Sequence, residues 1–200
     1  MTQPETTIII GGGQAGLATS YYLTQQGTPH VILEQAPYVG SAWRDGRWDS
    51  FTLVSPNWAF ALPGATYDGS EPDAYMAVPE IAARFDKYAA SLHPTIHYGV
   101  RVTSLTATGP GHPFHVQTDG GALQAASVVV AAGLYQRAKR PAWADALRGV
   151  EQLHSGEYRN PGRLSPGGVL VVGSSQSGAQ IAAELAQSGR QVYLALGTAG

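Results

Sequence analysis

Three glycines near the start of the chain have the spacing of a phosphate-binding turn. Gly11, Gly13 and Gly16 follow the β-branched run at residues 6–10 and form the pattern G-x-G-x-x-G. In such a turn the first glycine permits a sharp exit from a strand, the second lets a pyrophosphate approach the backbone, and the third lets the following helix pack closely on the strand. The N–H groups at the start of that helix then face the phosphates.

The next part of the chain supplies the group that a dinucleotide site needs for its ribose. A helix is predicted from Gly16 to about residue 26, where Gly27 ends it. A strand at residues 30–33 follows and ends at Glu34. A carboxylate about 20 residues after the glycines accepts hydrogen bonds from a ribose hydroxyl. Strand, turn, helix, strand and acid together predict a dinucleotide-binding unit.

The same arrangement recurs close to the end of the sequence. A strand at residues 169–172 leads into Gly173, and Gly178 takes the place of the third glycine. Ser175 replaces the middle glycine, so the backbone approaches a phosphate less closely. The serines of this turn are interpreted as phosphate-facing or N-capping groups. Two such units in one chain indicate two nucleotide sites, and hence electron transfer between two cofactors.

The second unit lacks the acid that the first unit has. The position equivalent to Glu34 falls on Ala195 or Leu196. Without a carboxylate there, the second site is not built to hold a ribose 2′-hydroxyl, but it is compatible with a 2′-phosphate if an arginine lies nearby. Arg190 precedes the strand and is a poor candidate for that arginine.

The elements between the two units complete an α/β fold. Residues 79–91 predict a helix whose core face carries Ile81, Phe85 and Tyr88 or Ala89. Four short strands are predicted at residues 95–98, 100–106, 114–118 and 127–130. We therefore expect a Rossmann-like dinucleotide-binding domain, with a parallel sheet, helices and a small antiparallel β-meander, followed by the truncated start of a second Rossmann nucleotide-binding domain.

The expected domain boundary lies at residue 166. Residues 1–166 are assigned to the first dinucleotide-binding domain, without its final segment, and residues 167–200 to the start of the second nucleotide-binding domain. The latter is too short to form a sheet covered on both faces, so we expect a piece of a longer protein. The G-S-A-W-R segment at residues 40–44 is expected to be a loop. The aromatic-rich stretch at residues 45–78 either covers a ligand or fills the edge of the core.

The composition excludes several classes of function. The 200 residues carry a net charge of −2, which gives no basic surface for nucleic acid. The sequence contains no cysteine, and its six histidines are scattered, so no metal site is expected. Neither a signal peptide nor an apolar run long enough to span a membrane is present, which favours a cytoplasmic location. The sequence gives no indication of oligomeric state.

Together these motifs resemble the N-terminal part of class B-type flavoprotein monooxygenases. This group includes flavin-containing monooxygenases, Baeyer–Villiger monooxygenases and CzcO-like flavoproteins. The resemblance spans nearly all of the chain and also rests on Gly40–Arg44 and on the strand that ends in Ala131-Ala132-Gly133, where the family has Ala-Thr-Gly. His154 and Tyr158 fit the second half of the monooxygenase signature F-x-G-x-x-x-H-x-x-x-(Y/F), but the first half is not matched.

The resemblance implies a Rossmann-like FAD-binding domain at residues 1–166, the start of an NAD(P)H-binding domain at residues 167–200, and the residues that hold each cofactor. FAD would be held by residues of the first unit and of the segments after it: Gly11, Gly13, Gln14, Ala15, Gly16, Glu34, Gln35, Gly40, Trp43, Arg44, Val102, Ala132 and Gly133. Trp43 and Arg44 would lie along the flavin, and the backbone of Val102 would meet the adenine. NADPH would be held by the second turn: Gly173, Ser174, Ser175, Gln176, Ser177 and Gly178. Asn57 is the candidate for the catalytic asparagine that monooxygenases place near the flavin.

The activity that the resemblance implies is an NADPH-dependent monooxygenation. NADPH would reduce FAD, and the reduced flavin would react with O2 to give a C4a-peroxide that oxygenates a small nitrogen-, sulfur- or ketone-containing substrate. Two alternatives stay open: a non-oxygenating NAD(P)H–flavin reductase or dehydrogenase, and a non-catalytic truncated FAD-binding module. The lack of cysteines excludes the dithiol branch of such reductases.

Overall fold

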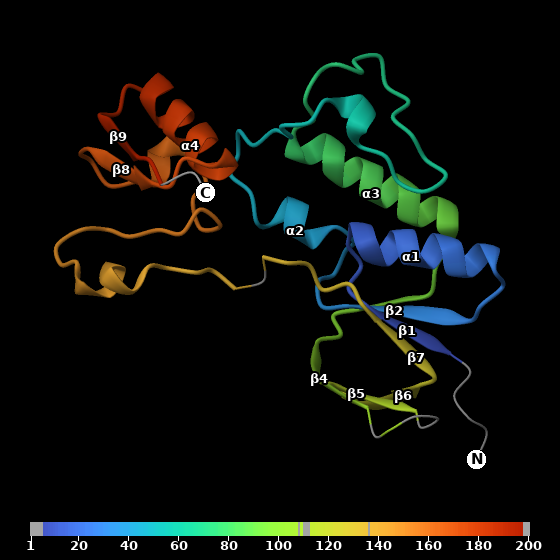
Figure 1. Cartoon of the computed structure of the whole chain (residues 1–200). Helices are drawn as coiled ribbons and strands as arrows, with labels where there is room; N and C mark the ends of the chain where they lie inside the picture. The colour runs from blue at the N-terminus through green and yellow to red at the C-terminus, as the bar shows by residue number, and fades with distance from the viewer. Residues whose placement is uncertain (1–5, 108, 110–112, 136, 198–200) are drawn as a thin grey trace.

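A parallel four-stranded sheet forms the centre of the first unit (Figure 1). The computed structural model describes residues 6–107, 109, 113–135 and 137–197. The strands of this sheet are β1 (Thr7–Ile10), β2 (His30–Glu34), β3 (Ile96–Tyr98) and β7 (Ser127–Val130). Their order is β3-β2-β1-β7, and every neighbouring pair is parallel. Because the chain builds outward from β1 to β3 and then returns to the other side of β1, a crevice is expected at the carboxyl ends of β1 and β7.

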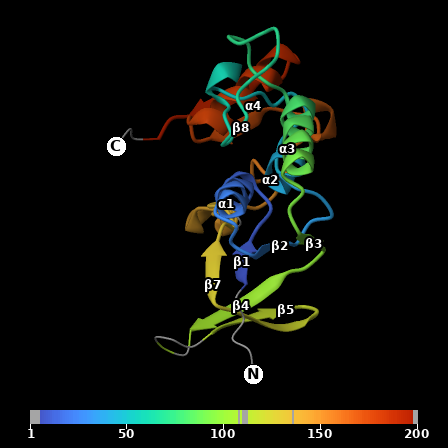
Figure 2. The same cartoon turned by 90° about the vertical axis from the view of Figure 1, so that its right-hand side faces the viewer.

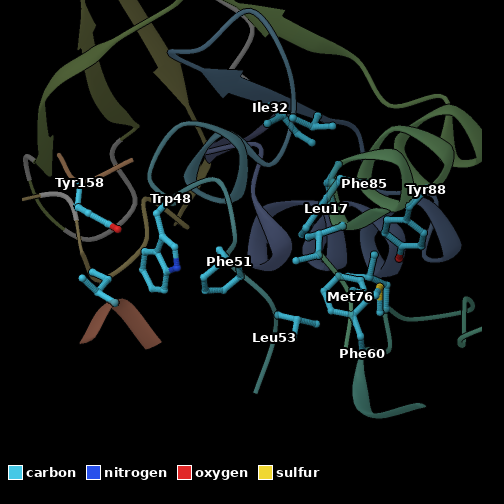
Figure 3. Packing of buried hydrophobic residues seen from close by; sticks show 14 of the residues in the cluster. Leu17, Ile32, Trp48, Phe51, Leu53, Phe60, Met76, Phe85, Tyr88 and Tyr158 are labelled. Atoms are coloured by element: carbon cyan, nitrogen blue, oxygen red, sulfur yellow. The ribbon is translucent and has the colours of Figure 1, made fainter. Parts of the chain in front are cut away.

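Two helices cover one face of this sheet. Helix α1 (Gln14–Gln25) begins two residues earlier than expected, because Gly13 is its extended N-cap and accepts a 3.0 Å hydrogen bond from the Leu17 N–H. Helix α3 (Val78–Leu92) buries Ile81, Phe85 and Tyr88, which confirms the stripe predicted from their spacing. These side chains and Leu17 belong to the main hydrophobic core (Figure 3).

An antiparallel meander covers the opposite face (Figure 2). It consists of β4 (Val102–Ala107), β5 (Phe114–Thr118) and β6 (Gly121–Ala125). The sequence did not predict β6 because its Gly-Ala-Leu-Gln-Ala segment has no β-branched or aromatic residue, and pairing with β5 makes it a strand. A second small core joins the meander to the sheet and contains Ile8, Leu33, Val116 and Ala125.

The segment at residues 40–44 is helical, so its prediction as a loop was wrong. Helix α2 (Ser41–Arg44) follows Gly40, which has a left-handed φ of 67°. The Trp43 N–H donates to the Gly40 carbonyl at 2.9 Å, and this bond closes the turn. A Cβ on Gly40 would come within 2.9 Å of the Phe85 ring, so glycine lets α2 lie close to α3.

The aromatic stretch after α2 serves mainly as core. Trp48, Phe51 and Phe60 are buried in the main cluster, whereas Trp58 and Tyr75 are exposed. Figure 3 shows the three buried rings within the packing. The stretch is irregular, as expected, apart from a short 3-10 helix η1 (Asn57–Ala59) and a bridge between residues 52 and 77. Core filling therefore accounts for these three aromatic residues, and the structure leaves the ligand-covering interpretation open for the exposed pair.

The second unit contains the predicted strand, helix and strand. They are β8 (Val169–Val172), α4 (Gln176–Gln187) and β9 (Val192–Ala195), and the two strands are parallel. Buried Ile181 and Leu185 on α4 join the same core cluster as Trp48. The Tyr158 hydroxyl donates to Glu184 Oε2 at 2.8 Å, and burial and this carboxylate raise the pKa of the phenol. The two units therefore share one core and a polar contact.

The connection between the units is mostly irregular, as predicted. It contains the 3-10 helices η2 (Ala142–Ala146) and η3 (Pro161–Arg163). Of the helices in the described ranges, none has the length and apolar character that crossing a bilayer requires. Together, the parallel sheet with helices, the meander and the second glycine-turn unit confirm the fold class expected from the sequence.

One arginine fastens the connection to the second unit. The Arg190 guanidinium donates to the carbonyl oxygens of Pro161, Leu164, Ser165 and Gly167 at 2.7–3.2 Å. Its four bonds hold the loop that leads into β8 against the turn that leads into β9. This role agrees with Arg190 being a poor candidate for a phosphate ligand.

Replacing Arg190 should loosen this connection. We expect Arg190→Met to lower the free energy of unfolding by about 1–2 kcal/mol, because four carbonyls lose a charged donor and turn to water. Urea denaturation followed by tryptophan fluorescence measures the change. Arg163→Met, at an exposed arginine of the same loop, is the matched control and should stay within about 0.5 kcal/mol of the original chain. Equal stability of the two variants would contradict the role of Arg190 in holding the loop before β8 against the turn before β9.

Candidate functional site

The first glycine turn is shaped by three close backbone approaches. Gly11 has a φ of 109°, and a Cβ there would lie 2.5 Å from the Ala131 carbonyl oxygen at the end of β7. A Cβ on Gly16 would overlap the carbonyl oxygen of Gly11. Glycine is therefore required at both positions by packing, before any ligand is considered.

Gly13 differs from its neighbours because nothing in the protein crowds it. A Cβ built on Gly13 would meet no atom within 4 Å in the described structure, and its φ of −86° is one that any residue adopts. Gln14 and Ala15 on the first turn of α1 are exposed, and no side chain among the described residues caps this helix. The turn thus presents free backbone N–H groups and open space, which is what a pyrophosphate needs.

Glu34 connects the turn to the end of β2. Its carboxylate is only 5% exposed, and Oε2 accepts a 2.6 Å hydrogen bond from the Gly12 N–H. Oε1 accepts a 2.8 Å bond from the Ala36 N–H. Each oxygen keeps a second lone pair that a ribose hydroxyl can use. A Cβ on Gly12 would lie 3.1 Å from Oε2, so the second glycine of the triplet makes room for this carboxylate.

The carboxyl end of β7 lies beside the same turn. The Ala131 N–H donates to the Ile10 carbonyl at 2.9 Å, which holds the end of β7 next to β1. Ala132 and Gly133 follow and are exposed, and Gly133 turns the chain with a φ of 79°. The structure therefore brings Gly11, Glu34 and residues 131–133 together at one edge of the sheet, where a doubly wound fold binds its ligand.

Gly40 and Val102 also belong to this edge. The Gly40 N–H donates to the Gly12 carbonyl at 3.1 Å, so α2 starts against the turn. The Val100 N–H donates to the Glu34 carbonyl at 3.0 Å, which places the start of β4 beyond the exposed Gln35. The contact of the Val102 backbone with adenine stays a prediction.

Arg44 is engaged by the protein itself. Its Nη2 donates to Asp86 Oδ1 at 2.6 Å and to the Ala82 carbonyl at 3.0 Å, and its Nε donates to the Val39 carbonyl at 3.2 Å. These bonds tie α2 to α3. Trp43 is half-buried, with its ring centroid 6.1 Å from that of Phe51. The flavin-side positions implied for Trp43 and Arg44 stay predictions.

Asn57 closes a surface loop. Its Nδ2 donates to the Glu71 carbonyl at 2.8 Å and to the Tyr67 hydroxyl at 3.3 Å, and its N–H donates to the Ala74 carbonyl. Its Oδ1 is buried and has no partner in the described part of the chain. The amide is therefore used structurally, and a catalytic role for Asn57 stays a prediction.

The second turn repeats the close approach of the first. A Cβ on Gly178 would overlap the Gly173 carbonyl oxygen, and Gly173 has a φ of 102°. Ser174, Ser175 and Gln176 are exposed, and Ser177 is half-buried. Ser175 is the N-cap of α4, but its hydroxyl forms no capping bond within the described residues. Ser175 therefore occupies the N-cap position without a side-chain capping bond, and the phosphate-facing interpretation of these serines stays a prediction.

The sequence motifs missed an arginine beside the site. Arg47 follows α2, and its guanidinium lies over the rings of Trp43 and Phe51 at 5.1 Å from each centroid. The available signal was an arginine beside tryptophans in a loop, a pattern that many structural loops also carry. For metals, no group of three or more histidines and carboxylates clusters in the described ranges, and His112 lies outside them.

Comparison with known proteins identifies the family. The family model described as pyridine nucleotide-disulphide oxidoreductase matches residues 8–199. The chain belongs to this family.

Relatives within and around this family agree with the resemblance inferred from the motifs. An uncharacterized CzcO-like oxidoreductase of Geobacillus kaustophilus (strain HTA426) is 40% identical over 191 residues, which are 95% of this chain and 53% of the relative. The indole-3-pyruvate monooxygenase YUCCA1 of Oryza sativa subsp. japonica is 27% identical over 184 residues, covering 91% of this chain and 45% of the relative. The chain spans about half the length of the curated relatives it matches.

A solved structure supports the same family and fold. The flavin-containing monooxygenase from Stenotrophomonas maltophilia superimposes with a TM-score of 0.88 and 28% identity. The match covers 99% of this chain and 59% of that one. The fold class and the resemblance to flavoprotein monooxygenases are thereby confirmed.

The two bonds of Glu34 can be tested by an isosteric change. We expect Glu34→Gln to lower the free energy of unfolding by about 1–3 kcal/mol. The carboxylate accepts hydrogen bonds from two backbone N–H groups, and in the glutamine the amide NH2, which cannot accept, would face one of them. Urea denaturation measures the loss. Glu71→Gln, at an exposed side chain, is the control and should change stability by less than about 0.5 kcal/mol. An unchanged Glu34→Gln variant would show that Glu34 does not hold the turn.

Proposed function

We propose that this chain is the cofactor-binding part of an FAD- and NADPH-dependent oxidoreductase whose whole protein is a monooxygenase. In this proposal residues 1–166 form the FAD-binding domain, which lacks its final segment, and residues 167–200 begin the NADPH-binding domain. The substrate is a small nitrogen-, sulfur- or ketone-containing molecule, and O2 is the second substrate. The protein acts in the cytoplasm and requires neither nucleic acid nor a membrane.

The observation that carries the proposal is the pairing of a turn with open phosphate space and a buried acid. Gly13 leaves room that no other described residue fills within 4 Å of a built Cβ, and the two oxygens of Glu34 accept one bond each from Gly12 and Ala36 at the same edge. Adenosine ribose at Glu34 and pyrophosphate at the start of α1 fit this arrangement. FAD, once bound, supplies the redox chemistry. The chain's own task is to position that cofactor and to exclude water from it.

The second unit supports NADPH as the electron donor. Its turn has the same Gly178–Gly173 approach as the first, and no carboxylate stands at Ala195 or Leu196 at the end of β9. Absence of the acid favours a 2′-phosphate over a free 2′-hydroxyl. Because α4 and the first unit share one core, hydride transfer between two nucleotides is compatible with the fold.

FAD binding is tested most sharply at Gly13. We expect Gly13→Ala to leave the free energy of unfolding unchanged within about 0.5 kcal/mol, because a methyl group there touches nothing. The same methyl group would occupy the phosphate space and weaken FAD binding about tenfold or more. Quenching of flavin fluorescence on titration with the chain measures the affinity.

The control for this test is Gly120→Ala in the β5–β6 turn, where a Cβ would meet only Thr118 Oγ1 at 3.8 Å. It should change neither stability nor FAD affinity. Equal FAD affinities for the original chain and Gly13→Ala would contradict phosphate binding at this turn.

The reaction class requires the whole protein. NADPH-dependent O2 uptake with an oxygenated amine, sulfide or ketone product is the expected result. NADPH oxidation without an oxygenated product would favour the alternative, a non-oxygenating NAD(P)H–flavin reductase. Flavin binding without any NADPH oxidation would favour a non-catalytic FAD-binding module.

A further inference from the structure

Buried polar atoms without a partner gather in one segment of the chain. Across the residues that the structure describes, these side-chain atoms are Arg47 Nε, Trp48 Nε1 and Asn57 Oδ1. All three belong to the stretch between α2 and the end of η1, and two of them are N–H donors on adjacent residues. Because a buried donor without an acceptor is costly, the adjacent donors on Arg47 and Trp48 point to a ligand that brings acceptors there. The Asn57 oxygen is itself an acceptor and belongs to the loop that Asn57 closes.

Arg47 is the member of this set with the most unused binding capacity. Its guanidinium is held over the rings of Trp43 and Phe51. Its side chain donates from Nη1 to the Gly46 carbonyl at 3.3 Å, and no carboxylate in the described residues forms an ion pair with it. Burial lowers the pKa of the guanidinium, and the Tyr135 phenol opposes this change. A stacked, desolvated arginine without an acid is suited to bind an acceptor-rich planar group.

The backbone around Arg47 is fixed from two sides. Arg159 donates to the carbonyl oxygens of Asp45 at 2.8 Å and Arg47 at 3.3 Å. On the other side, α2 is attached to the glycine turn through the bond from the Gly40 N–H to the Gly12 carbonyl. Arg47 is therefore positioned by the same framework that positions the phosphate-binding turn.

The sheet order tells which half of a dinucleotide Arg47 would meet. Glu34 ends β2 on one side of β1, whereas Tyr135 follows β7 on the other side. A dinucleotide with its adenosine ribose at Glu34 crosses the end of β1 and extends its other half toward β7. Arg47 follows α2, which is bonded to the turn after β1 through Gly40, and it is not among the hydrogen-bond partners of Glu34, so we assign it to that second half of the crevice.

We propose that Arg47 is a cofactor-binding residue that donates hydrogen bonds to the non-adenosine half of the bound dinucleotide. For FAD this half is the flavin, whose pyrimidine edge carries carbonyl acceptors. The inference rests on the proposed function and adds to it a residue that the glycine motifs do not contain.

The test compares FAD with ADP, which shares the adenosine diphosphate but lacks the flavin. Arg47→Met preserves much of the packing and removes the donors. We expect it to weaken FAD binding about tenfold, as for a lost hydrogen bond to a charged group, and to leave ADP binding within about twofold. Fluorescence titration measures the affinity for FAD, and calorimetric titration measures the affinity for ADP. Arg84→Met is the matched control, because Arg84 also stacks on a ring, that of Tyr67, but is paired with Asp68 and Glu80.

The outcomes separate this inference from the proposed function. Equal weakening of FAD and ADP, or no weakening of either, overturns the role of Arg47 while the original chain still binds both ligands. An original chain that binds neither ligand contradicts the proposed function instead. In that case the free energies of unfolding of the ligand-free variants, measured by urea denaturation, test the role of Arg47 separately. Stability equal to or above that of the original chain is expected once the unpaired donor is removed, and a larger loss than in Arg84→Met identifies a packing residue.

Discussion

The hydrogen bond from the Gly12 N–H to Glu34 Oε2 is the interaction on which the site depends. It joins the turn after β1 to the end of β2, and the second bond of Glu34, from the Ala36 N–H, fixes the chain that leaves β2. Because the Gly40 N–H in turn donates to the Gly12 carbonyl, one residue, Gly12, connects the acid, the phosphate-binding turn and α2. A single buried carboxylate thus organises three segments before any ligand arrives, so that a cofactor would meet a preformed surface.

The two glycine turns show how packing and binding divide the roles of a motif. Gly11 and Gly16 are explained by close backbone approaches. In the second unit Gly178 repeats the approach of Gly16, whereas Gly173 is explained by its left-handed φ of 102° alone. The middle position has no such explanation: Gly13 faces open space, and Ser175 replaces it in the second unit without strain. The first and third glycines are therefore required by the fold, whereas a glycine at the middle position is explained only by a ligand.

The sequence predicted whatever depends on local pattern. The spacing of Ile81, Phe85 and Tyr88 defined α3, and the glycine spacing defined both turns. It failed where a partner decides the structure and residue type does not: β6 exists because the neighbouring β5 pairs with it, and α2 forms where Gly40 meets the distant Phe85. The acceptors that Asp86 offers to Arg44 and Glu71 offers to Asn57 lie on α3 and on the loop after residue 66. No local motif could therefore reveal these bonds. Arg47 was missed because its isolation from carboxylates is visible only in three dimensions.

The clamp of Arg159 on residues 45–47 has a consequence for how the chain folds. The bond from Arg159 to the Asp45 carbonyl joins residues 114 positions apart, and the bond from Asn160 to Asp49 joins residues 111 apart. Contacts of such sequence separation raise contact order and slow folding, because the entropy of closing a long loop is lost before they form. The sheet around β1 and β2 can form early from local segments. The bonds from Arg159 to the carbonyl oxygens of residues 45 and 47 form only when the connection to the second unit is in place, so the segment that carries Arg47 becomes fixed late in folding.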